Sequence, residues 1–458
     1  MTRLVLDQAL DAQYLAALLQ EQGLAAETAA TKAGLLVQGA NRLATAGVGR
    51  RDPVNAFFVP GRIEVLGKHT DYAGGRSLVT AVDRGICLVA APRTDARIRL
   101  WDAVWDQQVD FDFTPQLEPS HGHWSNYPMT VARRLARNFP GPFRGANIAL
   151  GSDLPAAAGM SSSSALIIAT YLALAALNDL EGQNLYQSHI TGPFSLAEYL
   201  GTIENGQSFG ELAGDKGVGT FGGSEDHTAI LYSKPGQVGQ FQYCPTRFEC
   251  YIPVPDQAVW VVGFSGVVAE KTGAAQDLYN RASALAGAVV TAWQEATGGT
   301  EPYLAGILAR HADANQLRRL LQGAQQPTFT PDELIRRLDH FMAENEEIIV
   351  PAGQALGRGD FDAFGTLVDR SQALSDSLLG NQVPQTVSLA QTARQSGAWA
   401  ASAFGAGFGG SVWALVEGAR VEAFVEEWSR RYRAAFADLP QAPQFFQTQS
   451  GPAAFSLD

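Results

Sequence analysis

Hydrophobic residues recur with helical spacing at the start of the chain and then change to alternation. Between residues 6 and 43 the spacing is helical, as in ALDAQYLAALLQ, and Gly23 marks the break between two predicted helices. From residue 55 the pattern alternates in NAFFVPGRIEVLG and again in VTAVDRGICLVAA, with the polar stretch KHTDYAGGRSL between them. We therefore predict two strands joined by a polar loop. A helical extension over residues 1–50 precedes them and is expected to pack on the main body or on an oligomer partner.

Further along the chain the periodicity changes several times. Residues 96–113 alternate like an antiparallel hairpin, and residues 124–135 and 195–207 have the spacing of helices. Residues 259–264, VWVVGF, predict a buried strand. Helical patterns dominate after that strand, before a further strand, SVWALV, and a closing amphipathic helix, VEAFVEEWSRRYRAAF.

Turn signals mark a predicted domain boundary. Pro235 and Gly236 open a stretch of turns and short strands that lasts to residue 255. Because a chain of 458 residues exceeds what one hydrophobic core usually supports, two domains are expected. We assign residues 51–240 to an N-terminal lobe and residues 241–458 to a C-terminal lobe.

The stretch LPAAAGMSSSSA, residues 154–165, joins a predicted strand end, NIAL, to an apolar helix, ALIIATYLALAAL. That helix is long and leucine-rich enough to be buried, so the serines fall on its first turn. Unpaired backbone N–H groups, the positive end of the helix dipole and several hydroxyl groups then converge, and this combination favours phosphate. Gly159 lets the backbone approach such a ligand. A serine cluster before a helix can also be an N-cap with a polar loop.

Three other stretches carry candidate chemistry. Residues 68–76 place a lysine, a histidine, an aspartate and a tyrosine in one loop between strands, which suits a binding site, although a plain turn uses similar residues. The run GELAGDKGVGTFGGSEDH holds Asp226 immediately before an apolar pattern, so its carboxylate can be fixed at a loop edge; incidental acids on a surface loop are the alternative. The run AFGAGFGG leads straight into a strand, which indicates close approach of the backbone to a ligand or to another loop.

Composition and charge narrow the function classes. A formal net charge of −13, with no basic run, argues against a nucleic-acid surface. The three cysteines have no metal or redox spacing, which fits free thiols in a reducing cytoplasm. The N-terminus lacks the pattern of a signal peptide, and the most apolar run is too short to span a bilayer. We expect a soluble cytoplasmic protein with small-molecule partners and no membrane contact; the oligomeric state is not predicted.

Together the motifs resemble one family. GRIEVLGKHTDYAGG resembles the signature of galactokinases. LPAAAGMSSSSA resembles the phosphate-binding second motif of the superfamily of galactokinase, homoserine kinase, mevalonate kinase and phosphomevalonate kinase (the GHMP kinases), and GAGFGG resembles its third. WSNY and GGSEDH stand where galactokinases have a tryptophan–asparagine–tyrosine motif and the catalytic aspartate. Several motifs in the same order are more specific than any one of them.

The resemblance implies a fold and an activity. The fold is α+β, with two domains: an N-terminal mixed α/β lobe with a five-stranded sheet and a C-terminal ferredoxin-like α+β lobe. The active site lies in the cleft between them. The activity is ATP-dependent phosphorylation of a sugar at its anomeric hydroxyl group, with galactose as the leading substrate and galactose 1-phosphate and ADP as products.

The resemblance also implies roles for single residues. Asp226 would accept or orient the proton of the sugar hydroxyl, beside Arg62, which keeps the carboxylate ionised. Mg²⁺ would bridge two phosphates of ATP and be held by Ser162 or Ser163 together with Glu204. The residues implied for ATP binding are Trp124, Asn126, Gly159, Met160, Ser161, Ser162, Ser163, Ser164, Gly405 and Gly407. Those implied for sugar binding are Lys68, His69, Asp71, Tyr72, Gly223 and Tyr279.

Two positions depart from the family pattern and leave alternatives open. Galactokinases have a glutamate where this chain has Lys68, and an asparagine where it has Glu64. A lysine pairs more strongly with a carboxylate than with a hydroxyl, so a kinase for a uronic acid or another sugar modified at carbon 6 is one alternative. Glu64 can simply neutralise Lys68 on the strand. A non-catalytic sensor of sugar and ATP is a second alternative, which the retained Asp226 and Arg62 argue against.

Overall fold

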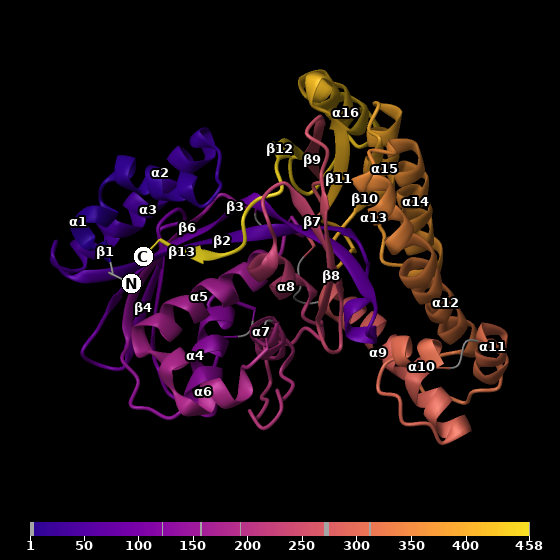
Figure 1. Cartoon of the computed structure of the whole chain (residues 1–458), viewed down its shortest axis with the longest axis horizontal. Coiled ribbons are helices and arrows are strands. Elements are labelled where there is room, and N and C mark those ends of the chain that lie inside the picture. The colour runs from indigo at the N-terminus through magenta and orange to yellow at the C-terminus, as the bar shows by residue number, and fades with distance from the viewer. Residues whose placement is uncertain are drawn as a thin grey trace.

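The computed structural model describes residues 4–120, 122–155, 158–192, 194–269, 274–310 and 313–457. Two residues of the predicted phosphate loop, 156 and 157, lie outside the described residues. The chain builds two β-sheets with helices around them (Figure 1).

Within the described residues the first sheet has nine strands, where the family resemblance implied five. Its order is β1-β2-β3-β6-β4-β5, with β13 beside β2 and with β7 between β3 and β8. The extra strands fit because β2 and β3 are long enough to take different partners along their length: β3 pairs with β6 through one half and with β7 through the other. The strands are β1 (Leu4–Val5), β2 (Pro53–Leu66), β3 (Arg76–Pro92), β4 (Arg97–Asp102), β5 (Gln107–Asp112), β6 (Ala146–Ser152), β7 (Gln237–Gln242), β8 (Arg247–Pro253) and β13 (Phe455–Ser456).

Helices cover both faces of this sheet, because side chains alternate along its strands. Phe58 of β2 joins the core under the N-terminal helices, whereas its neighbours Phe57 and Val59 join the core under α5. The N-terminal helices therefore pack on the main body. They are α1 (Leu6–Ala9), α2 (Ala12–Glu21) and α3 (Ala26–Thr45); the opposite layer has α4 (Asn126–Asn138), α5 (Ser162–Asn178), α6 (Asn184–His189), α7 (Ser195–Asn205) and α8 (Glu225–Tyr232) (Figure 1).

In the part of the chain that the structure describes, the second sheet has four antiparallel strands in the order β10-β11-β9-β12. Helices connect β9 to β10 and β11 to β12, which is the split β-α-β arrangement of ferredoxin-like domains. The ferredoxin-like C-terminal lobe is therefore confirmed. The strands are β9 (Ala258–Phe264), β10 (Ala400–Ala403), β11 (Ser411–Glu417) and β12 (Gln444–Thr448).

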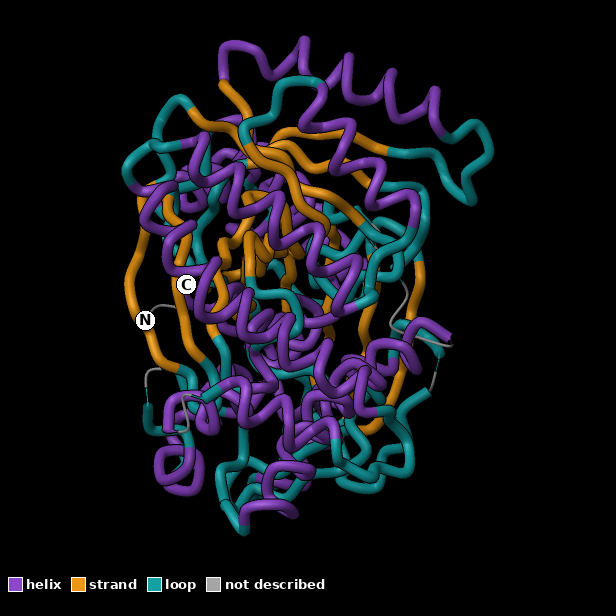
Figure 2. Tube along the Cα trace, turned by 90° about the vertical axis from the view of Figure 1, so that its right-hand side faces the viewer, coloured by secondary structure: helices purple, strands orange, loops and turns teal. Residues whose placement is uncertain are grey.

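The C-terminal helices form two groups. One group packs on the second sheet, where Trp428 and Leu389 share a core with Val261. The other is an arm with its own core around Val289 and Leu338, and Tyr72 of the polar loop packs against that core. Figure 2 shows these helices in front of the strands. The helices are α9 (Ala274–Thr297), α10 (Leu304–Arg310), α11 (Ala314–Gln322), α12 (Pro331–Met342), α13 (Ile349–Gly357), α14 (Phe361–Leu374), α15 (Pro384–Gln395) and α16 (Val421–Ala435), with π-helical turns at Ala343–Ile348 and Ser375–Leu379.

The two lobes share packing across the predicted boundary at residue 240. The largest hydrophobic core runs from Leu88 of the first sheet to Trp260 and Trp413 of the second. The chain also crosses back, since β8 and β13 belong to the first sheet. The boundary therefore stays a prediction, and a single cut does not describe which residues form each sheet.

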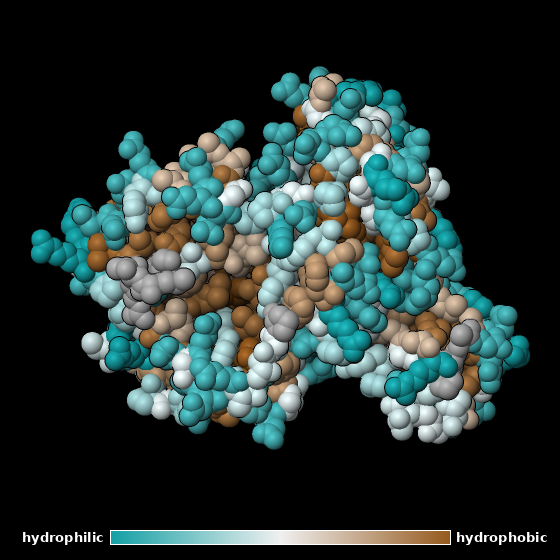
Figure 3. Space-filling model, viewed as in Figure 1, coloured by the Kyte–Doolittle hydropathy of each residue, from teal (hydrophilic) through white to brown (hydrophobic). Residues whose placement is uncertain are grey.

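The surface is mostly polar on the face shown in Figure 3, where hydrophobic residues show mainly in the hollow between the N-terminal helices and α5. Among the described residues, no helix is both long and apolar enough to cross a membrane.

Candidate active site

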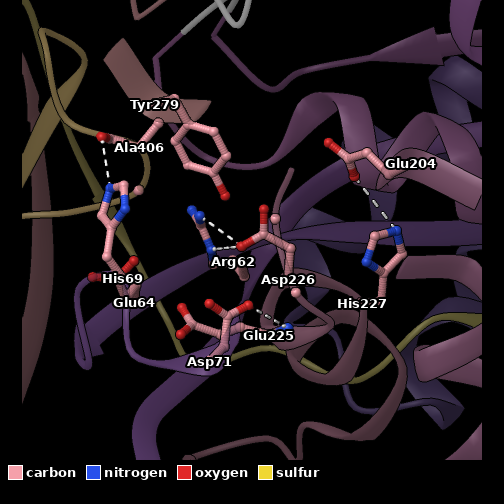
Figure 4. Close-up of a pocket in the computed structure, with 13 residues that line it drawn as sticks. Arg62, Glu64, His69, Asp71, Glu204, Glu225, Asp226, His227, Tyr279 and Ala406 are labelled. Atoms are coloured by element: carbon pink, nitrogen blue, oxygen red, sulfur yellow. Dashed lines mark hydrogen bonds and ion pairs between the residues drawn. The ribbon is translucent and has the colours of Figure 1, made fainter. Parts of the chain in front are cut away.

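The candidate site begins with the alternation of β2. Ile63 and Val65 are fully buried in the core under α5, so the residues between and before them, Arg62 and Glu64, face the other way. Both line a cavity that is closed by segments from both lobes (Figure 4). A strand thus presents a guanidinium and a carboxyl group to the same space.

Asp226 meets Arg62 across the cavity. It lies in the first turn of α8, where the helix dipole favours a carboxylate. Arg62 Nε donates to Asp226 Oδ1 at 2.8 Å, and Nη2 lies 2.7 Å from the same oxygen. Burial disfavours the charged guanidinium, but Asp226, Glu64 and Glu225 together raise the pKa of Arg62. Arg62 is therefore charged and pairs with Asp226, whose side chain keeps 17% of its surface exposed.

The serine run forms the start of α5, beside this pair. Ser161 has a left-handed backbone, with φ of 57°, and precedes the first helical residue. Its Oγ is buried and has no hydrogen-bond partner among the described residues. Ser164 Oγ lies 2.9 Å from Glu204 Oε2, to which it donates, and 3.4 Å from Asp226 Oδ2. The helix start, Glu204 of α7 and Asp226 of α8 therefore meet at one point.

The glycine motif at residues 403–410 packs against the serine motif. A Cβ atom at Gly405 would lie 2.8 Å from the Gly159 carbonyl oxygen, and one at Gly407 would lie 2.3 Å from that of Asn381. Both glycines have φ of 79°. The same Gly159 oxygen accepts from Arg62 Nη1 at 2.6 Å. The glycines are thus required by a close approach to other loops, one of the two explanations that the sequence left open.

The polar loop after β2 supplies the opposite wall. His69 Nε2 lies 3.0 Å from the Ala406 carbonyl oxygen, which can only accept, so in the neutral ring Nδ1 accepts from the Tyr72 hydroxyl at 2.7 Å. Asp71 Oδ2 accepts from the backbone N–H of Glu225 at 3.3 Å. These contacts tie the loop to the third motif and to α8.

Gly223 and Tyr279 close the cavity from the glycine-rich run and from α9. A Cβ atom at Gly223 would lie 2.3 Å from Asp71 Oδ2, and one at Gly222 would lie 2.7 Å from the Tyr279 hydroxyl oxygen. Burial, and then the charge of Asp71, raise the pKa of Tyr279 well above its ordinary value. Tyr279 is thus a neutral hydroxyl group at the cavity wall.

Lys68 does not line the cavity. The chain turns sharply at Gly67, whose φ is 113°, and the fully buried Lys68 side chain donates from Nζ to Ser402 Oγ of β10 at 2.7 Å. Ser402 in turn donates to Gln372. Tyr72 does not line the cavity either; its hydroxyl group donates to His69, which does. The ammonium group therefore links the two lobes behind the cavity and does not face it.

Trp124 and Asn126 lie at the start of α4. Trp124 packs on the core of the first sheet, with its indole Nε1 buried and without a partner among the described residues. Asn126 Nδ2 donates to the Val218 carbonyl oxygen at 3.4 Å. Neither lines the cavity with Arg62.

Five residues of the cavity wall were not predicted as site residues, and one of them is Glu64 of β2. Glu225 and His227 flank Asp226, and Gly222 and Ala406 adjoin predicted residues. His227 Nε2 lies 3.6 Å from Glu204 Oε2. Burial, and then Glu64 and Asp71, raise the pKa of Glu225 well above its ordinary value. The acidic pair at 225–226 was visible in the sequence, but a helix turn that exposes both to one cavity was not.

The residues present fit a nucleotide and a divalent cation. The buried Ser161 hydroxyl group lies at a helix start, has no partner among the described residues and can donate to an anion. Glu204 and the adjacent serines offer the oxygen ligands that Mg²⁺ prefers. Among the described residues no cluster of three or more histidines, cysteines or acids could hold a metal by itself.

Comparisons with known proteins agree with these motifs. Residues 126–207 match the N-terminal domain of GHMP kinases, residues 354–434 match their C-terminal domain, and residues 47–92 match the galactokinase galactose-binding signature. The galactokinase of Chloroflexus aggregans is 30% identical over 385 residues, covering 82% of this chain and 87% of the relative. That of Chloroflexus aurantiacus is 30% identical over 383 residues, covering 81% and 86%.

Solved structures share the fold. Lactococcus lactis galactokinase, complexed with galactose, has a TM-score of 0.74 at 24% identity and covers 91% of this chain and 98% of its own. Methanococcus jannaschii mevalonate kinase has a TM-score of 0.53 at 13% identity and covers 86% and 98%. The predicted two-domain fold is confirmed.

Proposed function

The chain belongs to the galactokinase family of sugar kinases, and from this premise we propose that it transfers the terminal phosphoryl group of ATP to the anomeric hydroxyl group of galactose. One observation carries the proposal. Asp226, held by Arg62, lies between the start of α5 and the polar loop, so it separates a phosphate-type subsite from a subsite lined by carboxyl and imidazole groups that can bind sugar hydroxyl groups.

In this proposal Asp226 accepts or orients the proton of the reacting hydroxyl. Its Oδ1 accepts from Arg62 Nε at 2.8 Å, and its Oδ2 lies 3.4 Å from Ser164 Oγ. Arg62 holds the carboxylate in place and offsets negative charge that develops on the transferred group. Arg62 also donates to Gly159, so a single side chain positions both the acid and the serine motif.

The nucleotide would lie over the start of α5. The backbone N–H groups of the first turn and the Ser161 hydroxyl would donate to phosphate oxygens. Ser162 or Ser163, with Glu204, would hold Mg²⁺, which neutralises phosphate charge when bound. Ser164 and His227 would orient the Glu204 carboxylate through the contacts described above.

The sugar would lie between Asp71, His69, Gly223 and Tyr279. A carboxylate such as Asp71 can accept from two adjacent hydroxyl groups, which suits a sugar. The alternative of a uronic acid rested on Lys68 facing the substrate, and the contact of Lys68 with Ser402 removes that support. The cavity wall instead holds Glu64, Asp71, Glu225 and Asp226, which favour a neutral sugar over an acid.

The proposal is tested by offering the purified protein a panel of sugars with ATP and Mg²⁺ and following ADP release. We expect turnover with galactose that exceeds turnover with galacturonate and with other neutral aldoses. Galacturonate as the best substrate would contradict the assignment of the sugar. Binding of galactose and ATP by calorimetry without any ADP release would contradict the phosphoryl transfer itself.

A further inference from the structure

One carboxyl group of the cavity has no role in the proposed transfer. Glu64 lines the wall beside Arg62 and is only 4% exposed. Its Oε1 is buried and has no hydrogen-bond partner among the residues that the structure describes. Buried polar atoms without partners are rare because they lose hydration and gain nothing in return. The unused hydrogen-bonding capacity of Oε1 therefore points to a partner that a ligand in the cavity supplies.

Charge balance with Lys68 does not account for Glu64. Lys68 Nζ donates to Ser402 Oγ at 2.7 Å, and no ion pair joins it to Glu64 within the described ranges. Lys68 and Arg62 favour the ionised form of Glu64, but burial outweighs both and raises its pKa to about 7. A side chain kept only as a counter-ion would have its pKa lowered by its partner.

We propose that Glu64 is a specificity-determining residue whose carboxyl group hydrogen-bonds one hydroxyl group of the bound sugar. The inference rests on the proposed function, because it takes the cavity to be the sugar site. Glu204 and His227 lie on one side of the Arg62–Asp226 pair and Glu64 lies with His69 on the other (Figure 4). The hydroxyl that meets Glu64 is therefore not the one that is phosphorylated.

The chemistry of the group suits this task. A carboxyl group accepts from a hydroxyl when it is ionised and donates to one when it is protonated, so a sugar hydroxyl satisfies it in either state. The rigid position of β2 between α5 and the cavity fixes where that hydroxyl must lie. A site built around one hydroxyl rejects an analogue that lacks it, because the buried partner is then left unpaired.

The experiment uses Glu64→Leu and Glu64→Gln in the full chain, with kcat and KM measured for galactose and for a series of deoxygalactoses, each lacking one hydroxyl other than the anomeric one. For galactose, Glu64→Leu should raise KM by about 10- to 100-fold with a smaller change in kcat, and Glu64→Gln should raise it less. For one deoxygalactose, wild type and Glu64→Leu should have the same KM. Equal effects of Glu64→Leu on every sugar would overturn the assignment.

Two controls separate this role from charge balance. Glu249→Gln removes a carboxylate from β8, where it pairs with Arg76 outside the cavity, and should leave KM unchanged. Lys68→Met is combined with Glu64→Gln in a double-mutant cycle. If Glu64 contacts the sugar, the KM ratio caused by Glu64→Gln persists with Met at position 68; if Lys68→Met restores the wild-type KM, the proposal is overturned. Thermal unfolding of each variant confirms that it is folded.

The same measurements keep the two proposals apart. Turnover by the wild type decides the proposed function before any variant is compared. Turnover with galactose together with an unchanged KM in Glu64→Leu overturns only the role of Glu64. No turnover with any aldose overturns the sugar-kinase assignment, and the inference about Glu64 with it.

Discussion

The two sides of the Arg62–Asp226 pair differ in how their acids are satisfied. On the side of α5, Glu204 accepts from Ser164 Oγ at 2.9 Å and from Thr220 Oγ1 at 3.4 Å. On the side of the polar loop, Glu64 Oε1 has no partner among the described residues, and burial raises the pKa values of both Glu64 and Glu225. Glu204 thus has hydrogen-bond partners before any ligand arrives, and Glu64 Oε1 does not.

This difference separates two tasks. A group that must hold charge during phosphoryl transfer has to be positioned in advance, because reorganisation during the reaction would cost rate. A group that recognises a neutral sugar is completed by the sugar itself, and its unsatisfied state disfavours a wrong occupant. Arg62 and Glu64, which are neighbours on one face of β2, thus bring a fixed charge and an unfilled hydrogen-bonding capacity to the same cavity.

The largest effect is expected from the fixed side. Asp226→Asn removes the proton acceptor while keeping the shape, so kcat should fall by roughly 1,000-fold, with ATP affinity unchanged. Rapid-quench or coupled-assay kinetics and calorimetry with ATP measure the two quantities. Asp110→Asn, which loses an ion pair with Arg99 on the hairpin, is the matched control. A fully active Asp226→Asn enzyme would contradict its role.

The next largest effect concerns Glu64 and is a pH dependence of the free energy of unfolding. The folded-state pKa of Glu64 is raised from 4.5 to about 7, so the folded protein keeps a proton that the unfolded chain releases. Wild-type stability from this group is present below pH 4.5 and is lost as the pH rises through 7. The Glu64→Gln variant does not lose stability in this way, because an amide does not titrate. Its free energy of unfolding relative to wild type should therefore rise by on the order of 3 kcal/mol across this window.

Urea unfolding of both proteins at pH 4 and pH 8, which lie below and above this window, measures the change. A difference in stability between Glu64→Gln and wild type that is the same at both pH values would show that the Glu64 carboxyl group is not protonated by burial.

The smallest effect concerns the support of Glu204. Ser164→Ala removes the hydroxyl that holds Oε2 and should raise the Mg²⁺ concentration required for half-maximal rate by about 10-fold, with a loss of about 1 kcal/mol in stability. Titration of the rate with Mg²⁺ checks the first value. Ser377→Ala, on an exposed turn of the C-terminal lobe, is the control. An unchanged Mg²⁺ requirement would mean that Ser164 does not orient Glu204.

Much of this architecture was predictable from periodicity and motif order. The helical spacing around Gly23, the alternation around Ile63 and the apolar helix after the serines correspond to α2 and α3, β2, and α5. The meeting of Arg62 with Asp226 followed from the family resemblance. The number of strands in the first sheet did not, because short strands such as β1 and β13 have no period of their own and exist only through pairing with β2.

Lys68 and Glu64 show where reasoning from the sequence stops. Both residues depart from the family pattern within one motif. The hypothesis of a role in sugar binding was placed on Lys68, because its charge is opposite to that of the usual glutamate. The backbone turn at Gly67, whose missing side chain makes room for Ser77, directs Lys68 toward Ser402. The spacing of Arg62 and Glu64 on one strand face was a signal that could have placed Glu64 at the cavity.

The pairing of β13 with β2 has a consequence for biosynthesis. Phe455 pairs with Phe58, and Gly451 donates to the Ala81 carbonyl oxygen, so the edge of the first sheet is completed by a segment that is synthesised long after β2. Until then the strand that carries Arg62 has an open flank, which a nascent chain exposes to wrong pairing. A chain truncated before Gly451 would lose this pairing although it still contained every motif of the cavity.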